Sequence, residues 1–129
     1  MPKNKTKGSN LERELCLKLI SRGYRAVRVA GSGAMKNADC DIIAGNRKKK
    51  YCIEAKSSKK LIKYISKEQM NRFISFARIF GLEPLIALRF DRQEWVFVRP
   101  NQLKESGKTL SMSLEKAKKV GKKFEEIFK

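Results

Sequence analysis

Three charged residues near the middle of the chain have the types and spacing of a site that acts on phosphodiesters. Asp41 begins one apolar stretch, and Glu54 and Lys56 lie two residues apart in the next one. Because side chains of a strand alternate between two faces, Glu54 and Lys56 share a face. Carboxylates on neighbouring strands form a hard oxygen site suited to Mg²⁺, and an adjacent lysine can orient water or stabilise developing charge. These groups together could hydrolyse a phosphodiester.

The two stretches are predicted to pair as a hairpin. Residues 45–50 have the composition of a connection between two strands. A turn centred on residues 47 and 48 places Ile42 opposite Ile53 on one face and Asp41 opposite Glu54 on the other. Since side chains alternate with period two, a slip of one residue would separate the carboxylates. The candidate site therefore depends on this register.

Each of these residues also has a purely structural explanation. A helical pattern is predicted from residue 10 to 22, and Glu12 follows Ser9 by three, which completes a capping box. Asp41 could be satisfied by turn amides, and Asp39 lies close enough to compete with it as a ligand. Glu54 and Lys56 could form a solvent-facing ion pair that contributes at most ~1 kcal/mol. At this point both explanations stay open.

The composition limits the chemistry and the partners. The 129 residues include 31 Lys and Arg against 13 Asp and Glu, a formal net charge of +18. Such a field attracts nucleic acid, although a ribosomal role or binding to anionic lipid would also fit, and abundant charge is also typical of proteins from hot environments. Histidine is absent, which excludes Ser-His and Cys-His pairs and imidazole metal sites.

The remaining composition predicts one cytoplasmic domain without membrane contact. Three scattered cysteines, Cys16, Cys40 and Cys52, favour buried free thiols over a disulfide framework or zinc cluster. No apolar run approaches the ~18 residues of a membrane span, and the N-terminus lacks the pattern of a secretory signal. The length fits a single domain, in which we expect a flexible basic arm over residues 1–8 and a basic tail over 101–129.

Further elements follow from their patterns. A strand is predicted from residue 24 to 30, followed by a loop through residue 37. The Ser66-x-x-Gln69 pattern predicts the start of a second helix that ends near Gly81. A hairpin of 85–90 with 95–98 completes the central part. In the tail, apolar residues at helical spacing between lysines predict a short amphipathic helix, with a solvated lysine face as the default and DNA or membrane contact as the alternative.

The second helix and the second hairpin carry more apolar residues than one core face needs. The apolar side chains of the helix cover an arc of roughly 220°, and the hairpin is apolar on both faces. A homodimer interface accounts for this excess, and full burial of the hairpin inside the sheet is the alternative. The predicted interface residues are Phe73, Phe76, Ile79, Trp95 and Phe97.

Asp41 followed by Glu54-Ala55-Lys56 is similar to the PD-(D/E)-x-K nuclease motif. Around it stand the stretches GSNLER (8–13), VRVAGSG (27–33), DIIAGN (41–46), IEAK (53–56) and FARIFG (76–81). In this order and at these spacings, the chain resembles the archaeal Holliday-junction resolvases from about residue 5 to 98, with the tail outside the resemblance. Cys40 stands where the superfamily motif often has proline, a residue that ligates nothing.

The resemblance implies an α/β fold of the restriction-endonuclease type, with a central mixed β-sheet flanked by α-helices in one domain. It implies a homodimeric endonuclease that nicks two opposing strands of a four-way DNA junction, in recombination and repair, with Mg²⁺ as cofactor and Mn²⁺ as a substitute. The implied catalytic residues are Glu12, Ser32, Asp41, Glu54 and Lys56, with Asp41, Glu54 and Glu12 at the metal. The expected DNA-binding residues are Lys3, Lys5, Lys7, Arg13, Arg28 and Lys36.

Two other functions remain as alternatives. A nuclease with the same core could act on duplex or flapped DNA, as restriction-type and repair endonucleases do. A protein that binds nucleic acid without cutting it could carry the same acidic residues for structural reasons.

Overall fold

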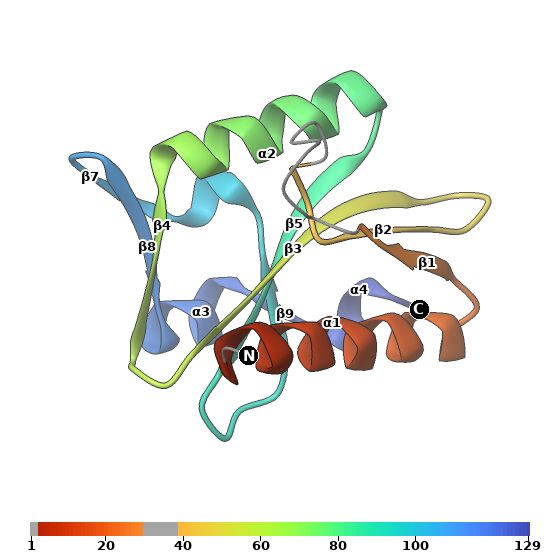
Figure 1. The fold of residues 1–129 in the computed structure, drawn as a ribbon, viewed down its shortest axis with the longest axis horizontal. Coiled ribbons are helices and arrows are strands. Elements are labelled where there is room, and N and C mark those ends of the chain that lie inside the picture. Colours follow the sequence, from red (N-terminus) through yellow and green to blue (C-terminus); the bar gives the residue numbers. More distant parts are fainter. Residues whose placement is uncertain (1–2, 30–38) are drawn as a thin grey trace.

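The structure is a computed structural model that describes residues 3–29 and 39–129, with only the backbone described for residues 3–7 and 9. A six-stranded mixed sheet has the order β1-β2-β3-β5-β6-β9 (Figure 1). Its strands are β1 (Arg25–Arg28), β2 (Ile42–Gly45), β3 (Lys50–Ser58), β5 (Glu83–Phe90), β6 (Val96–Val98) and β9 (Lys122–Lys123). Strands β3 and β5 are parallel, and the other pairs are antiparallel.

Helices cover both faces of this sheet. Helices α1 (Lys3–Ser21) and α4 (Phe124–Ile127) pack on one face, and α2 (Lys67–Phe80) and α3 (Leu114–Val120) pack on the other. Figure 1 shows α1 and α2 on opposite sides of the strands. A smaller antiparallel sheet, of β4 (Ile62–Ser66), β8 (Thr109–Ser113) and β7 (Lys104–Ser106), lies on the α2 side, and a 3₁₀ helix (Pro100–Gln102) precedes β7.

Helix α1 is longer than its sequence pattern predicted. It begins at Lys3 rather than near residue 10, so most of the expected basic arm is helical backbone. Leu15 and Leu19 lie one turn apart and are fully buried against the sheet. Because Ser9 and Glu12 lie within this helix, the prediction that they form a capping box at its N-terminus is wrong.

The register of the first hairpin is confirmed. Ile42 pairs with Ile53 across β2 and β3, and both side chains are buried under α1. The backbone N–H of Asp41 donates to the carbonyl of Ile53 at 3.1 Å, which extends the pairing one residue beyond β2. The side chain of Asp41 therefore lies on the opposite face of the sheet from Ile42, beside Glu54.

Helix α2 begins and ends where predicted. The Ser66 hydroxyl accepts a hydrogen bond from the backbone N–H of Gln69 at 3.1 Å, and Gly81 caps the C-terminus with a left-handed φ of 88°. Most residues avoid this conformation and glycine adopts it easily, so Gly81 stops the helix at the predicted point.

Three of the five predicted interface residues belong to the core. Phe73, Trp95 and Phe97 are each almost fully buried within the single chain, so their assignment to a dimer interface is wrong. The alternative, burial inside the sheet, holds for the second hairpin, because α1 and α4 cover one face and α2 and α3 the other. Ile79 and Phe80 remain exposed at the end of α2, next to the half-buried Phe76.

The C-terminal tail is an integral part of the fold. Phe124 and Phe128 are buried, and the Phe128 ring makes edge contacts with Tyr24 and Tyr51 at centroid distances of 5.3 and 5.4 Å. Strand β9 adds to the edge of the main sheet by pairing with β6. The predicted short amphipathic helix is present as α3 and α4, but it is anchored in the core rather than solvated along its length.

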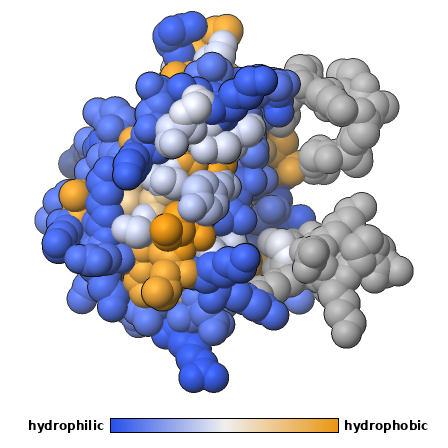
Figure 2. All heavy atoms as spheres, turned by 90° about the vertical axis from the view of Figure 1, so that its left-hand side faces the viewer, coloured by the Kyte–Doolittle hydropathy of each residue, from blue (hydrophilic) through white to orange (hydrophobic). Residues whose placement is uncertain are grey.

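The three cysteines are buried and free, as predicted. In the part of the chain that the structure describes, no helix is long and apolar enough to cross a membrane. The side of the molecule seen in Figure 2 is mostly hydrophilic, with pale, weakly polar residues and an apolar patch between the charged ones.

Candidate functional site

Asp41 and Glu54 meet where β2 and β3 begin to separate. One carboxylate oxygen of Asp41, Oδ2, accepts a hydrogen bond from the backbone N–H of Ala55 at 2.9 Å. This bond holds the Asp41 side chain over β3, on the face that carries Glu54. Because the bond comes from the backbone, it depends on the strand register and not on the identity of residue 55.

Glu54 is buried, with 5% of its surface exposed, and no other charged residue in the described part of the chain is buried. Its Oε2 accepts a hydrogen bond from the side-chain amide of Gln69 at 2.6 Å and lies 3.3 Å from the ammonium nitrogen of Lys56. The alternative that Glu54 and Lys56 form a solvent-facing pair is therefore wrong. A buried carboxylate held by two donors has a fixed orientation, as a ligand or catalytic group requires.

The two carboxyl groups are electrostatically strained. Burial, followed by the charge of Asp41, raises the pKa of Glu54 to about 7, although Lys56 and Gln69 act in the opposite direction. Burial also raises the pKa of Asp41, against the lowering effect of the Ala55 amide and Lys56. Perturbed carboxyl pairs of this kind are typical of functional sites.

Glu12 reaches the same site from α1. Its Oε1 lies 3.2 Å from the Nε of Arg28 on β1. Burial and the charge of Asp41 raise the pKa of Glu12, while Arg28 and Lys56 lower it. Because Glu12 interacts electrostatically with both Asp41 and Lys56, the structure brings four of the five predicted catalytic residues together.

The donor set fits a hard divalent cation. Asp41 and Glu54 offer carboxylate oxygens. Burial, together with the charge of Asp41 in the case of Glu54, makes the ionised form of these groups unfavourable, and a bound cation would stabilise that form. Among the described residues, no three His, Cys, Asp or Glu side chains already converge as a ligand cage. Two carboxylates completed by water and a substrate phosphate are the arrangement that Mg²⁺ commonly uses.

Asp39 and the nearby cysteines do not belong to the set. Asp39 forms an ion pair with Arg72 on α2, with Oδ1 and Nε 3.4 Å apart, whereas Asp41 is bonded to the backbone of β3 beside Glu54. A hydrogen bond to Cys40, together with burial, raises the pKa of Cys52 far above that of a free thiol. The Cys52 thiol is therefore unsuited to act as a nucleophile or ligand.

The other predicted residues are only partly described. Ser32 and Lys36 lie outside the described residues, and the side chains of Lys3, Lys5 and Lys7 do too. Arg13 is exposed on α1, one residue after Glu12, and Arg28 lies beside Glu12. Their roles in DNA binding stay predictions.

One residue of the site was missed at the sequence level, although its position was noted. Gln69 is explained locally as the last residue of the Ser66 capping box, but its side chain does not complete that box. It bonds Glu54 instead. The only sequence signal would have been a polar residue on the side of α2 that faces the sheet.

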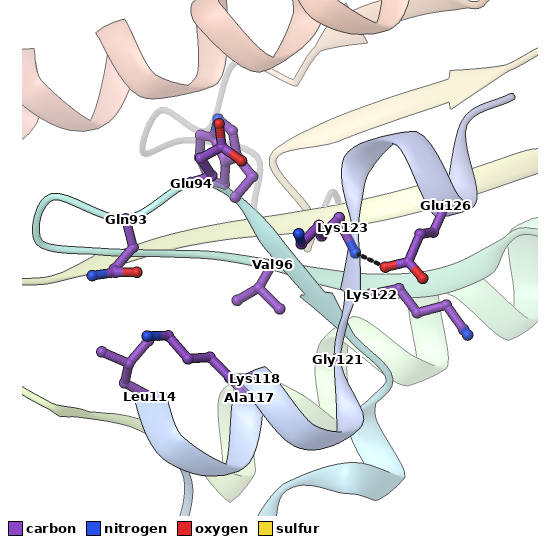
Figure 3. Close-up of a pocket in the computed structure, with 11 residues that line it drawn as sticks. Gln93, Glu94, Val96, Leu114, Ala117, Lys118, Gly121, Lys122, Lys123 and Glu126 are labelled. Carbon is purple, nitrogen blue, oxygen red and sulfur yellow. Dashed lines mark hydrogen bonds between the residues drawn. The ribbon is translucent and has the colours of Figure 1, made fainter.

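A hollow of about 450 Å³ elsewhere on the surface contains none of these groups (Figure 3). It lies between β6, α3 and α4, and Val96, Leu114 and Ala117 form its apolar wall. Lys123 donates its backbone N–H to Glu126 at 2.8 Å at its rim. The chemistry of the candidate site is therefore separate from this hollow.

Comparisons with known proteins point to one family. A family model described as archaeal Holliday junction resolvase (Hjc) matches residues 3–129. The chain is 37% identical over 131 residues to the crossover junction endodeoxyribonuclease Hjc of Archaeoglobus fulgidus, covering 96% of each protein. It is 36% identical over 121 residues to the enzyme of that name from Methanocaldococcus jannaschii, covering 94% of this chain and 86% of that protein.

The fold agrees as well. A solved structure of A. fulgidus Hjc, a Holliday junction resolvase from an archaeal hyperthermophile, superposes with a TM-score of 0.87 at 31% identity. The match covers 94% of this chain and 99% of the other. The predicted restriction-endonuclease-like fold is confirmed, and the family match includes the tail that the sequence resemblance had left out.

Proposed function

Because the chain belongs to the archaeal Holliday junction resolvase family, we propose that it is a structure-selective endonuclease that cuts four-way DNA junctions. The observation that carries the proposal is the convergence of Asp41, buried Glu54 and Lys56 on one face of the β2–β3 hairpin. This convergence supports hydrolysis rather than binding alone, because two neighbouring carboxyl groups, one of them buried, destabilise a protein that does not use them, and the one ammonium of Lys56 offsets only part of their charge.

The proposed cofactor is Mg²⁺, with Mn²⁺ as a substitute. Asp41 and Glu54 would hold the ion, with Glu12 joining directly or through water. When bound, a divalent cation activates water and neutralises charge on the phosphate oxygens. Two neighbouring groups keep the ligands in place: the backbone N–H of Ala55 orients Asp41, and the side chain of Gln69 orients Glu54.

Lys56 is proposed to act on the reacting phosphate. Its ammonium lies 3.3 Å from Glu54 Oε2 and is only partly exposed. From this position it can hold a water or stabilise the oxyanion that develops as the phosphodiester is attacked. Arg28, which pairs with Glu12, adds a second positive charge near Asp41.

The strong positive charge suits a substrate in which several backbones meet. With a net charge of +18, the protein can contact phosphates of more than one arm without reading bases. We propose that Arg13, Arg28, Lys36 and the lysines of the N-terminal helix make such contacts. Ser32 is proposed to take part in cleavage. Selectivity then follows the shape of the junction rather than its sequence.

The decisive test compares substrates of the same sequence. A four-way junction is expected to be nicked in two opposing strands with Mg²⁺, and a duplex or flap built from the same strands is expected to be cut far more slowly. End-labelled strands report the cuts. Equal cutting of the duplex would favour the restriction-type alternative, and no cutting of any substrate would favour a binding protein.

We further propose that the enzyme is a homodimer, since two opposing strands must be cut and a twofold protein places one site on each. The apolar end of α2 supports a partner surface: Ile79 and Phe80 are 80% and 60% exposed, and the Phe80 ring stacks on Phe76 with centroids 5.5 Å apart. Burying such side chains between two copies is favourable by about 25 cal/mol per Å². Phe76 and Ile79 thus remain from the predicted interface.

Replacing Ile79 by Glu is expected to convert the dimer to a monomer without unfolding it, because the side chain makes no core contact in the single chain. Sedimentation would show the mass, and a thermal melt would show that the monomer is folded. Arg78→Gln, which makes the same change of −1 in net charge at the preceding exposed position, is the control. A wild-type chain that sediments as a monomer would contradict the proposal.

A further inference from the structure

Lys63 on β4 is a half-buried lysine outside the PD-(D/E)-x-K motif. Its neighbours in the strand, Ile62 and Tyr64, are exposed, whereas Lys63 shares the inner face of the small sheet with the buried Ile65. Across that sheet it pairs with Met112, which is also buried. Lys63 therefore points toward the main sheet and not away from the molecule.

Strand β4 is attached to the strand that carries the site on both sides of Lys63. At its start, the Ser58 hydroxyl donates to the carbonyl of Ile62 at 3.3 Å. After its end, Gln69 donates to Glu54 at 2.6 Å. Figure 1 shows β4 running from the end of β3 to the start of α2. These two bonds hold Lys63 against the part of β3 that contains Lys56.

Lys63 has a cationic neighbour but no acidic partner. Every Asp and Glu of the sequence lies in the described part of the chain, and within that part none forms an ion pair with Lys63. Burial, followed by the ammonium of Lys56, lowers the pKa of Lys63. Lys56 already pairs with Glu54, whereas Lys63 pairs with no carboxylate among the described residues, so an anion bound beside Lys63 would offset the repulsion from Lys56.

We propose that Lys63 binds a DNA phosphate next to the scissile one and forms, with Lys56, a phosphate subsite beside Asp41 and Glu54. This inference rests on the proposed nuclease function. Lysine binds phosphate as a point charge, and such a contact fixes the position of the strand without reading its sequence. Lys56 faces the reacting group, and Lys63 holds the neighbouring linkage in register with it.

The test couples a charge removed from the protein with a charge removed from the DNA. Lys63→Met keeps the length of the stem, Lys63→Arg keeps the charge, and Lys59→Met removes an exposed lysine from the neighbouring β3–β4 connection as a control. Each protein is assayed on junctions that carry one uncharged methylphosphonate at successive linkages around the cut. Cleavage rates and junction binding in Ca²⁺ are both measured.

On the ordinary junction, Lys63→Met is expected to slow cleavage about ten- to hundredfold, the range of a lost charged hydrogen bond, and Lys63→Arg to recover most of the rate. One methylphosphonate position should slow the wild type and Lys59→Met but not slow Lys63→Met further. The unfolding temperature of Lys63→Met should equal or exceed that of the wild type, because a repelled charge is removed.

The subsite would be overturned if the methylphosphonate slowed Lys63→Met as much as the wild type at every linkage. Cleavage by Lys63→Met at the wild-type rate would overturn it as well. If the wild type cuts no substrate, the proposed function fails and the binding measurement decides on Lys63 alone. Loss of the contact should reduce the salt dependence of junction binding by a slope of about 0.9 for each phosphate contact. An unchanged slope would leave Lys63 as a packing residue whose stem covers Met112.

Discussion

Asp41→Asn is expected to lower the rate of junction cleavage by about 10³-fold or more while junction binding in Ca²⁺ stays within a few fold of the wild type. The amide keeps the shape of the side chain and can still accept the hydrogen bond from Ala55. It loses the negative charge that a divalent cation requires. Glu54→Gln should give the same result, because Gln69 can still bond the remaining oxygen of residue 54.

Asp39→Asn is the matched control for this experiment. It makes the same chemical change two residues earlier, in a side chain that pairs with Arg72 on α2 and not with the candidate site. Its cleavage rate should remain close to that of the wild type. Full activity in Asp41→Asn, or a comparable loss in Asp39→Asn, would show that the carboxylate pair has been assigned wrongly.

The juxtaposition of Asp41 and Glu54 could be predicted because it depends on a local, periodic element. The paired stretches around residues 42 and 53 leave one register that buries both isoleucines, and the same register places Asp41 beside Glu54. The start of α2 was predictable for a similar reason, since capping residues act within one turn. Signals of this kind lie within a few residues of the feature that they determine.

Contacts between distant segments were not predictable. Phe128 carries no local sign that it will pack against Tyr24 and Tyr51, which precede it by about a hundred and about eighty residues. Without that packing the tail looks like a lysine-rich amphipathic helix. Trp95 and Phe97 were assigned to an interface for the same reason. An apolar residue indicates that its side chain is buried, but it does not indicate whether the same chain or a partner buries it.

Glu12 and Gln69 illustrate a third limit. Each has a sufficient local explanation as the last residue of a capping box, and for each the structure gives a different partner. The backbone half of the box is real for Ser66 and Gln69, whereas the α1 box disappears because the helix starts earlier. A satisfied local pattern therefore does not exclude a second, longer-range role for the same side chain.

The raised pKa of Glu54 predicts that the carboxylate site destabilises the metal-free protein. The pKa is about 7 in the folded chain against an ordinary value of 4.5. Between these values the folded protein binds more protons than the unfolded one, so the contribution of Glu54 to the free energy of unfolding falls as pH rises through this window. From pH 4.5 to 8 the loss is about 3 kcal/mol.

The effect is best measured as a difference between two proteins, because the other acidic groups also titrate. Residue 54 cannot ionise in Glu54→Gln. In EDTA, the free energy of unfolding of this variant minus that of the wild type should therefore increase by about 3 kcal/mol between pH 4.5 and 8. Urea unfolding at several pH values gives this difference. Glu68→Gln, at a side chain that is 85% exposed in the first turn of α2, should show almost none of it.

Adding a divalent cation tests the same site from the other direction. A cation that binds Asp41 and Glu54 stabilises only the folded chain, and it competes with the proton on Glu54. Mg²⁺ should therefore raise the unfolding temperature of the wild type at pH 8 more than at pH 5.5, and it should leave Glu54→Gln nearly unchanged at both. Parallel pH profiles for the two proteins in EDTA would mean that Glu54 titrates as an ordinary carboxyl group. Cation binding then restores the stability that the metal-free wild type lacks at pH 8. A buried carboxyl pair that lowers the stability of the metal-free protein therefore makes sense as a cation site.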